Sequence, residues 1–200
     1  RFWHKFLYDI GVVSTKRPFQ KLINQGLVLG PDGQKMSKSK GNVIGPDEMI
    51  EKFGADALRM YEMFMSPFGD QKPWDPRGII GLKRFLDRVW GLASLYPFDD
   101  AGEKNTGNNV IRQMNTNHSL HGTIKGVGED IDNFKFNTAI SKLMILLGYL
   151  ETCPDKSAFV EFLKLLAPFA PHMTEEIWHK FGSKKSIHLE KWPDANPQFL

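Results

Sequence analysis

The stretch KMSKSKGNV, at residues 35–43, decides the fold of this chain, and we call it the lysine loop. It places three lysines and two serines in six consecutive residues, directly before Gly41. The apolar run at 27–29 and the Gly-Pro-Asp-Gly sequence at 30–33 precede it, which predicts a strand and a turn leading into the loop. Lysines supply mobile positive charge, serine hydroxyls donate hydrogen bonds, and glycine permits unusual backbone angles. The loop therefore suits a phosphate chain.

The charge distribution supports the same interpretation. Residues 1–46 hold eight Lys or Arg against Asp9 and Asp32, although the whole chain has a net charge of only +3. A local basic excess suggests a polyanion such as nucleotide phosphates or nucleic acid. The loop lacks the GxxxxGK[ST] pattern of a Walker A loop. A solvated basic turn is the alternative interpretation of any such lysine-rich sequence.

Apolar periodicity predicts the secondary structure of the remainder. Residues 2–10 have helical spacing up to Gly11, and two short helices are expected at 47–54 and 55–65, after the strands expected at 22–23 and 27–29. Three long apolar stripes begin at Ile79, Ala139 and Phe159, and a short fourth begins at Ile177; together they predict a helix bundle. Residues 110–135 have a partial helical face, and 99–109 have the composition of a loop or linker.

Composition limits the class of protein. A hydrophobic content of 41%, with 12% aromatic residues, is enough for a substantial core. No apolar run approaches the roughly 20 residues of a membrane span, so no membrane partner is expected. Cys153 is the only cysteine, which excludes an intrachain disulfide and fits a reducing cytoplasm. We therefore expect a cytoplasmic globular protein.

The lysine loop has a specific context. It is followed by a Pro-Asp helix start and by FGADALR at residues 53–59. This order resembles the second signature of the Rossmann-type aminoacyl-tRNA synthetases. Two further stretches, FNTAI at 136–140 and LLAPFAPHMTEEIW at 165–178, resemble helices of the anticodon-binding bundle in the members specific for aliphatic amino acids. The resemblance covers nearly the whole chain.

Three other stretches narrow the resemblance. RFWHKFLYDIG at 1–11, NQGLVLG at 24–30 and YEMFMSPFGDQKPW at 61–74 are most similar to the bacterial leucyl members. The valyl, isoleucyl and methionyl members remain as alternatives. The implied fold class is mostly α, with a remnant of a Rossmann-type α/β catalytic domain followed by an anticodon-binding helix bundle. The implied domains are the catalytic part with a helical connector at 1–72, the bundle at 73–185 and a lead-out at 186–200.

The resemblance also implies site residues and ligands. The ATP-binding residues would be Lys35, Met36, Ser37, Lys38 and Ser39, of which Lys38 and Lys35 would be catalytic. The substrates would be ATP and leucine, with Mg²⁺ accompanying ATP, and the partner would be tRNA(Leu). Basic residues of the bundle would contact tRNA phosphates. The candidates are Arg77, Lys83, Arg84 and Arg88, with Arg112 and Lys125 as further possibilities.

One departure from the family pattern bears on activity. The first signature of the family, a His-x-Gly-His type sequence, is absent. His118 and His121 are three residues apart, but they lie in an expected helix without the glycine, so they do not replace it. We expect an N-terminal catalytic half outside this chain and no adenylate synthesis by the chain alone. A stand-alone or split-subunit tRNA-binding module is the alternative function.

Other histidines and tryptophans have structural interpretations. His172 follows Pro171 at an expected helix junction, so it is expected to cap a helix or bond to backbone rather than to catalyse. Trp74, Trp90, Trp178 and Trp192 could stack on RNA bases. Trp90 and Trp178 lie on apolar stripes, which favours core packing for these two.

Overall fold

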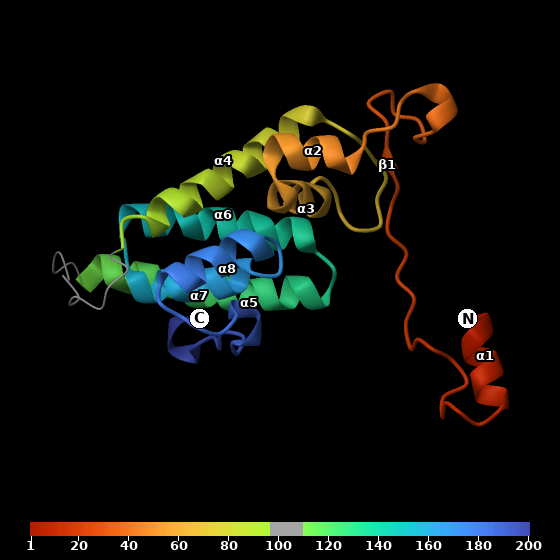
Figure 1. The fold of residues 1–200 in the computed structure, drawn as a ribbon. Helices are drawn as coiled ribbons and strands as arrows, with labels where there is room; N and C mark the ends of the chain where they lie inside the picture. Colours follow the sequence, from red (N-terminus) through yellow and green to blue (C-terminus); the bar gives the residue numbers. More distant parts are fainter. Residues whose placement is uncertain (97–109) are drawn as a thin grey trace.

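Helices dominate the part of the chain that the computed structural model describes, which is residues 1–96 and 110–200 (Figure 1). In chain order the elements are α1 (Phe2–Asp9), β1 (Val28–Leu29), η1 (Lys38–Lys40), α2 (Pro46–Phe53), α3 (Ala55–Phe64), β2 (Lys72–Pro73), α4 (Pro76–Ala93), α5 (Val110–Asp132), α6 (Phe136–Thr152), α7 (Lys156–Leu166), α8 (Pro171–Lys180), η2 (Ile187–Leu189) and η3 (Pro197–Phe199). The mostly α fold is therefore confirmed. The loop or linker expected at 99–109 lies outside the described residues.

A two-stranded parallel sheet leads into the lysine loop. Val28 of β1 pairs with Lys72 of β2, and Leu29 pairs with Pro73. Trp74 donates its backbone N–H to Leu29 at 3.0 Å. Proline in β2 has no N–H to donate, so the pairing stays short. The strand expected at 27–29 is confirmed, whereas the one expected at 22–23 is wrong, because those residues have no paired neighbour among the described residues.

Helices α2 and α3 connect the sheet to the bundle. Pro46 begins α2, where its fixed φ suits the first turn, and Gly54 with φ of 88° separates the two helices. A residue with a side chain would be strained at that angle, so the glycine allows α3 to start directly after α2. Met60 and Tyr61 of α3 are buried, and Tyr61 donates its hydroxyl to the Asp75 carbonyl at 2.6 Å. The connector is therefore part of the core.

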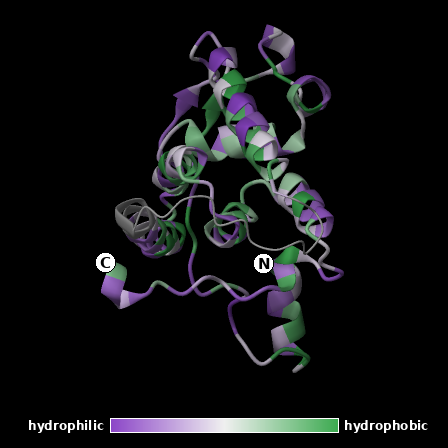
Figure 2. Ribbon diagram, turned by 90° about the vertical axis from the view of Figure 1, so that its left-hand side faces the viewer, coloured by the Kyte–Doolittle hydropathy of each residue, from purple (hydrophilic) through white to green (hydrophobic). Residues whose placement is uncertain are grey.

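The bundle consists of α4 to α8, and hydrophobic and hydrophilic residues are interspersed along its helices (Figure 2). Helices α4 and α7 are capped by the side chain of the residue that precedes them: Asp75 accepts from the Arg77 N–H at 3.0 Å, and Asp155 accepts from the Ser157 N–H at 2.8 Å. The expected stripes supply the core. Fully buried large side chains include Phe159, Phe162, Phe169, Ile79, Leu82, Ile140, Leu143, Leu147 and Leu163. The expected helix bundle is confirmed.

The two ends of the chain differ in their contacts. Helix α1 stands apart from the other helices at the end of an extended segment (Figure 1), and none of its residues is buried. By contrast, the last residues return to the bundle. The ring of Phe199 stacks on that of His121 with centroids 5.2 Å apart, and His118 Nδ1 lies 3.0 Å from the Phe199 carbonyl. His118 and His121 lie one turn apart on α5, and both contact the C-terminal segment.

Two aromatic side chains lie elsewhere than expected. Trp90 of α4 is exposed, and its ring lies 3.9 Å from Lys180 Nζ, so core packing was the wrong expectation for it. Because Trp90 lies at the edge of the stripe, a lysine covers its face instead of the core. Trp74 is buried against Tyr61 and cannot stack on a base without unfolding, whereas Trp192 is exposed.

No helix among the described residues is long and apolar enough to cross a lipid bilayer.

Candidate functional site

The lysine loop leaves the carboxyl end of β1 through a tight turn. Gly30 donates its N–H to the Gln34 carbonyl at 2.8 Å, and Gly33 at φ 72° donates to the Gly30 carbonyl at 2.9 Å. One turn of 3₁₀-helix, η1, then ends at Gly41, whose φ of 64° suits glycine. The loop follows a strand, as expected. It projects at the upper right of Figure 1, beyond the start of α2.

The two lysines assigned to the site are both exposed. Within residues 1–96 and 110–200, neither the Lys35 nor the Lys38 ammonium has a hydrogen bond or ion pair. Lys40 differs, because its Nζ donates to Gln34 Oε1 at 2.6 Å. An exposed ammonium keeps its rotamer freedom and can follow a bound anion. The loop can therefore present two mobile positive charges to a ligand.

The other three assigned residues give the loop its internal contacts. Met36 is partly buried and packs against the hydrophobic core. Ser37 Oγ and Ser39 Oγ are 2.8 Å apart, so the two hydroxyls bond to each other. All five assigned ATP-binding residues thus lie in one loop. Their roles toward ATP remain a prediction.

Asn42 and Asp32 organise the loop, and the sequence analysis did not single them out. Asn42 Oδ1 accepts from the Ser37 N–H at 2.8 Å, and Asn42 Nδ2 donates to Asp32 Oδ2 at 3.0 Å. The hydrogen bond from the Gln34 N–H, followed by that from Asn42, lowers the pKa of Asp32 despite partial desolvation. The sequence feature that could have identified them is their position in turns, since Asp32 lies inside the Gly-Pro-Asp-Gly turn and Asn42 follows Gly41.

Carboxylates near the loop do not form a metal site. The first turn of α2 contains Asp47 and Glu48, which favour the positive end of the helix dipole, and Glu48 pairs with Lys52 at 2.6 Å. In the described part of the chain, no group of three or more His, Cys, Asp or Glu residues is arranged to hold a metal ion. Acidic residues here stabilise a helix.

The candidate tRNA-binding residues lie on α4, away from the loop in sequence, and three of the four are already paired. Arg77 binds Asp75 at 2.9 Å, Lys83 binds Asp87 one helical turn later, and Arg88 Nε binds Glu151 of α6 at 2.8 Å. Arg84 is exposed and has no partner among the described residues. Lys125 of α5 is also exposed and has no partner among the described residues. The side chain of Arg112 is not among the side chains that the structure describes.

A buried carboxylate joins the connector to the bundle. Asp56 of α3 is 7% exposed and accepts from the backbone N–H of Met173 at 2.7 Å and from that of His172 at 3.3 Å. His172 Nδ1 also lies 2.7 Å from Asp56 Oδ1. Asp56 therefore caps the start of α8 from another helix. His172 bonds to this side chain rather than to backbone, which corrects the expected partner but keeps its structural role.

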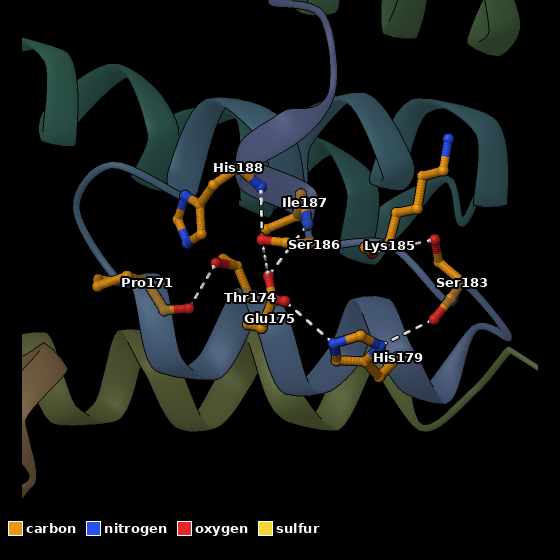
Figure 3. A network of polar contacts seen from close by, with 9 residues as sticks. All are labelled: Pro171, Thr174, Glu175, His179, Ser183, Lys185, Ser186, Ile187 and His188. Carbon is orange, nitrogen blue, oxygen red and sulfur yellow. Dashed lines mark hydrogen bonds and ion pairs between the residues drawn. The ribbon is translucent and has the colours of Figure 1, made fainter.

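A second polar network lies along α8 and joins it to the segment that follows (Figure 3). Glu175 accepts from Ser186 Oγ, the Ile187 N–H and His179 Nε2, each at 3.0 Å. His179 Nδ1 lies 2.8 Å from the Ser183 carbonyl. Both ring nitrogens face acceptors, so this geometry suits the protonated imidazolium. These hydrogen bonds connect η2 to α8, and the polar groups of the network are hydrogen-bond partners of one another.

Two family models match the chain. Residues 1–75 match the family described as tRNA synthetases class I (I, L, M and V), and residues 115–200 match the anticodon-binding domain of tRNA ligase. Curated relatives include a leucine-tRNA ligase of Chlorobium chlorochromatii, 49% identical over 100% of this chain, and one of Chloroherpeton thalassium, 49% identical over 97%. The chain spans about a quarter of the length of these relatives, 25% and 24% respectively.

Solved structures with a similar fold include a LeuRS. The Agrobacterium radiobacter LeuRS, in a ternary complex with tRNA and LeuAMS, superposes with a TM-score of 0.83 at 30% identity, covering 100% of this chain and 27% of its own. The Mycobacterium tuberculosis methionyl-tRNA synthetase in complex with methionyl-adenylate gives 0.63 at 19% identity, covering 88% and 40%. The second likeness concerns the fold alone.

Proposed function

Because this chain belongs to the class I tRNA synthetases, and within them to the leucine-tRNA ligases, we propose that the polypeptide containing it activates leucine with ATP and transfers it to tRNA(Leu). The observation that carries this proposal is the lysine loop. Lys35 and Lys38 are exposed and unpaired in the described part of the chain, while the backbone that bears them is held by hydrogen bonds. Free cations on a fixed loop are what a triphosphate needs.

In the proposed first step, a leucine carboxylate oxygen attacks the α-phosphorus of ATP. The bond between the α-phosphorus and the bridging oxygen breaks, and pyrophosphate leaves with the bonding electrons. Negative charge therefore grows on the β-phosphate side, where Lys38 and Lys35 would place their ammonium groups. In the second step a ribose hydroxyl of tRNA attacks the acyl carbon and AMP leaves.

The other loop residues would support these two lysines. Met36 keeps the loop on the core, and the Ser37 and Ser39 hydroxyls would turn from each other toward phosphate oxygens when ATP binds. The described residues include no carboxylate cluster that fits a resident metal ion. We therefore assign no step to the Mg²⁺ that accompanies ATP, and no residue of this chain as its ligand.

The bundle would bind tRNA through its phosphates. Arg84 and Lys125 are the candidates with free charges among the described residues, whereas Arg77, Lys83 and Arg88 would first have to leave Asp75, Asp87 and Glu151. The division at 1–72, 73–185 and 186–200 belongs to this proposal, with activation in the first part and tRNA binding in the second. So does a cytoplasmic location, where tRNA is charged.

The test is ATP-pyrophosphate exchange by the full polypeptide. Lys38→Ala is expected to slow leucine-dependent exchange by about 10² to 10³. Lys184→Ala removes the same charge from an exposed position far along the chain and serves as the control. Equal rates for the Lys38 variant and the parent would refute the role of the loop. Comparing leucine, valine, isoleucine and methionine as substrates decides the amino acid.

The alternative function, a tRNA-binding module, has a test of its own. Filter binding with chain 1–200 and tRNA at low salt measures the affinity without any catalysis. Binding together with an absence of exchange activity in the full polypeptide would favour the module. Negligible binding by the chain would exclude it.

A further inference from the structure

Asn42 occupies a position that requires an amide. Its Oδ1 accepts from the Ser37 N–H at 2.8 Å, while its Nδ2 donates to both oxygens of Asp32, at 3.0 and 3.2 Å. An N–H can only donate and an ionised carboxylate can only accept, so the two ends of the amide cannot exchange places. Asp32 Oδ1 also accepts from the Gln34 N–H at 3.0 Å. We call Asp32 and Asn42 the loop brace.

The brace occupies space that Gly30 leaves free. A Cβ added to Gly30 would lie 2.6 Å from Asp32 Oδ1 and 2.9 Å from Asn42 Nδ2. Both distances are below those of any normal contact, so either the brace or the turn would have to shift. Gly30 is itself fixed by its N–H bond to the Gln34 carbonyl at 2.8 Å. Three positions spread over the loop and its preceding turn thus fit together as one unit.

The brace controls the backbone between the two site lysines. Ser37 lies between Lys35 and Lys38, and its N–H is the donor that Asn42 holds. The Lys35 carbonyl receives a further, longer bond from Asn42 Nδ2 at 3.4 Å. The lysine side chains themselves take no part in the brace. The loop is therefore ordered through its backbone, and the charges of Lys35 and Lys38 stay available.

From this geometry we propose that Asn42, held by Asp32 beside Gly30, is a positioning residue that sets the direction in which Lys35 and Lys38 approach the leaving pyrophosphate. The inference rests on the proposed function of the loop. Its physical reason is that a backbone held in one conformation leaves only the side-chain rotamers of the two lysines to reorganise when charge develops on the leaving group. Loss of the brace is expected to lower the rate of the chemical step more than the affinity for ATP.

The test exchanges the roles of the two brace residues. Asn42→Asp keeps the acceptor for the Ser37 N–H but places a second carboxylate against Asp32, and Asp32→Asn alone places two amide donors face to face. The double variant D32N/N42D restores one donor and one acceptor, because the amide introduced at position 32 then donates to the carboxylate introduced at position 42. Each single variant is expected to lose about tenfold or more in exchange kcat. The double variant is expected to recover to within about threefold of the parent.

Two measurements test the brace and the proposed function of the loop separately. Kinetics use leucine-dependent ATP-pyrophosphate exchange by the full polypeptide, with kcat and KM for ATP fitted separately. Hydrogen exchange of the Ser37 amide in the same proteins reports the brace without ATP. Protection is expected to fall in N42D, because repulsion between the carboxylates at positions 32 and 42 moves the acceptor away from the Ser37 N–H, and to return in the double variant. The control Asn133→Asp adds the same charge at an exposed position directly after α5 and is expected to change neither readout.

The outcomes are decisive in both directions. An active parent whose single variants keep their kcat, or whose double variant fails to recover it, overturns the positioning role. Unchanged Ser37 protection in N42D overturns the brace itself. A parent without exchange activity defeats the proposed function, and the catalytic meaning of the brace with it, while the hydrogen-exchange result still decides whether the brace orders the loop.

Discussion

Asp56 shows how one residue can link two parts of the molecule. It lies in the first turn of α3, and its carboxylate accepts hydrogen bonds from the first free N–H groups of α8 and lies next to His172 Nδ1. A helix N-terminus exposes donors that need acceptors, and here the acceptor comes from a helix far earlier in the chain. Arg59 adds a bond from the same helix to the Pro168 carbonyl at 3.3 Å. The relative position of α3 and α8 depends on these contacts.

We predict that Asp56→Ala lowers the free energy of unfolding by about 2–3 kcal/mol, because it leaves buried N–H groups without acceptors. Asp155→Ala is the matched variant, since it removes an ordinary cap within α7 and should cost about 1 kcal/mol. Chemical denaturation of chain 1–200 measures both. Equal losses for the two variants would contradict the bridging role of Asp56.

The second residue-scale prediction concerns His179. Its hydrogen bond to the Ser183 carbonyl, followed by that to Glu175, raises the pKa of His179 above its ordinary value. The stability that the protonated form contributes is present below about pH 6.5 and is lost as the pH rises through the raised pKa. NMR titration should place the midpoint above about 6.5 and find a lower midpoint in Glu175→Gln. A midpoint that Glu175→Gln leaves unchanged would contradict the pairing.

At the scale of elements, α4 combines packing with surface charge. Its inner face buries Ile79, Leu82 and Phe85, while its cations point away from the core. Ion pairs occupy three of the four candidate tRNA-binding residues on this helix, and exposed pairs of this kind add little stability. They do, however, compete with phosphates for the same side chains. Arg84 is the cation of α4 that faces no such competition within the described residues.

We expect Arg84→Ala to weaken tRNA binding by the full polypeptide and to reduce the slope of log affinity against log salt by about 0.7–0.9, as the loss of one phosphate contact does. Arg77→Ala removes a cation already neutralised by Asp75 and should change the slope less. Filter binding across a salt series measures both slopes. Identical slopes for parent and Arg84→Ala would remove Arg84 from the interface.

At the scale of the whole molecule, the core and the N-terminal segment are physically separate. The buried cluster extends from Met49 to Ile187 and includes residues of α2 to α8. Helix α1 contributes nothing to it, and the side chains of Phe2 and Trp3 are 75% and 70% exposed. Burial of apolar surface is the main source of stability, so the stability of this chain resides in residues 49–187 rather than in the N-terminal segment.

Removal of residues 1–24 should therefore leave the thermal midpoint of the chain within about 2 °C, because no buried side chain is lost. The truncation stops before Gly26, because its backbone packs closely on the segment before β2. Its N–H bonds to the Phe68 carbonyl, and an added Cβ would lie 1.9 Å from the Asp70 carbonyl oxygen. Circular dichroism of 1–200 and 25–200 measures the difference. A drop of more than about 5 °C would mean that α1 contributes to the core after all.

Local sequence predicted most elements because their signals are local. Gly54, Pro46 and Pro171 mark helix boundaries, and the stripes of α6 and α7 are buried as their periodicity indicated. The lysine loop was located by its residue types alone. The prediction of a strand at 22–23 was wrong because an apolar pair forms a strand only where a partner strand exists. The prediction that Trp90 packs in the core was wrong because a residue at the edge of a stripe can be covered by a neighbouring side chain, here that of Lys180.

The sequence by itself determined that this chain has a lysine-rich loop after a strand, a helix bundle and the motifs of a class I tRNA synthetase. Those properties follow from residue types at short spacing. Only the tertiary structure decided which cations are free, that Asp56 caps α8, and that Asn42 and Asp32 brace the loop. Each of these depends on which partner lies across a turn or in a distant helix, and hydrogen-bond partners at such separations have no periodicity in the sequence.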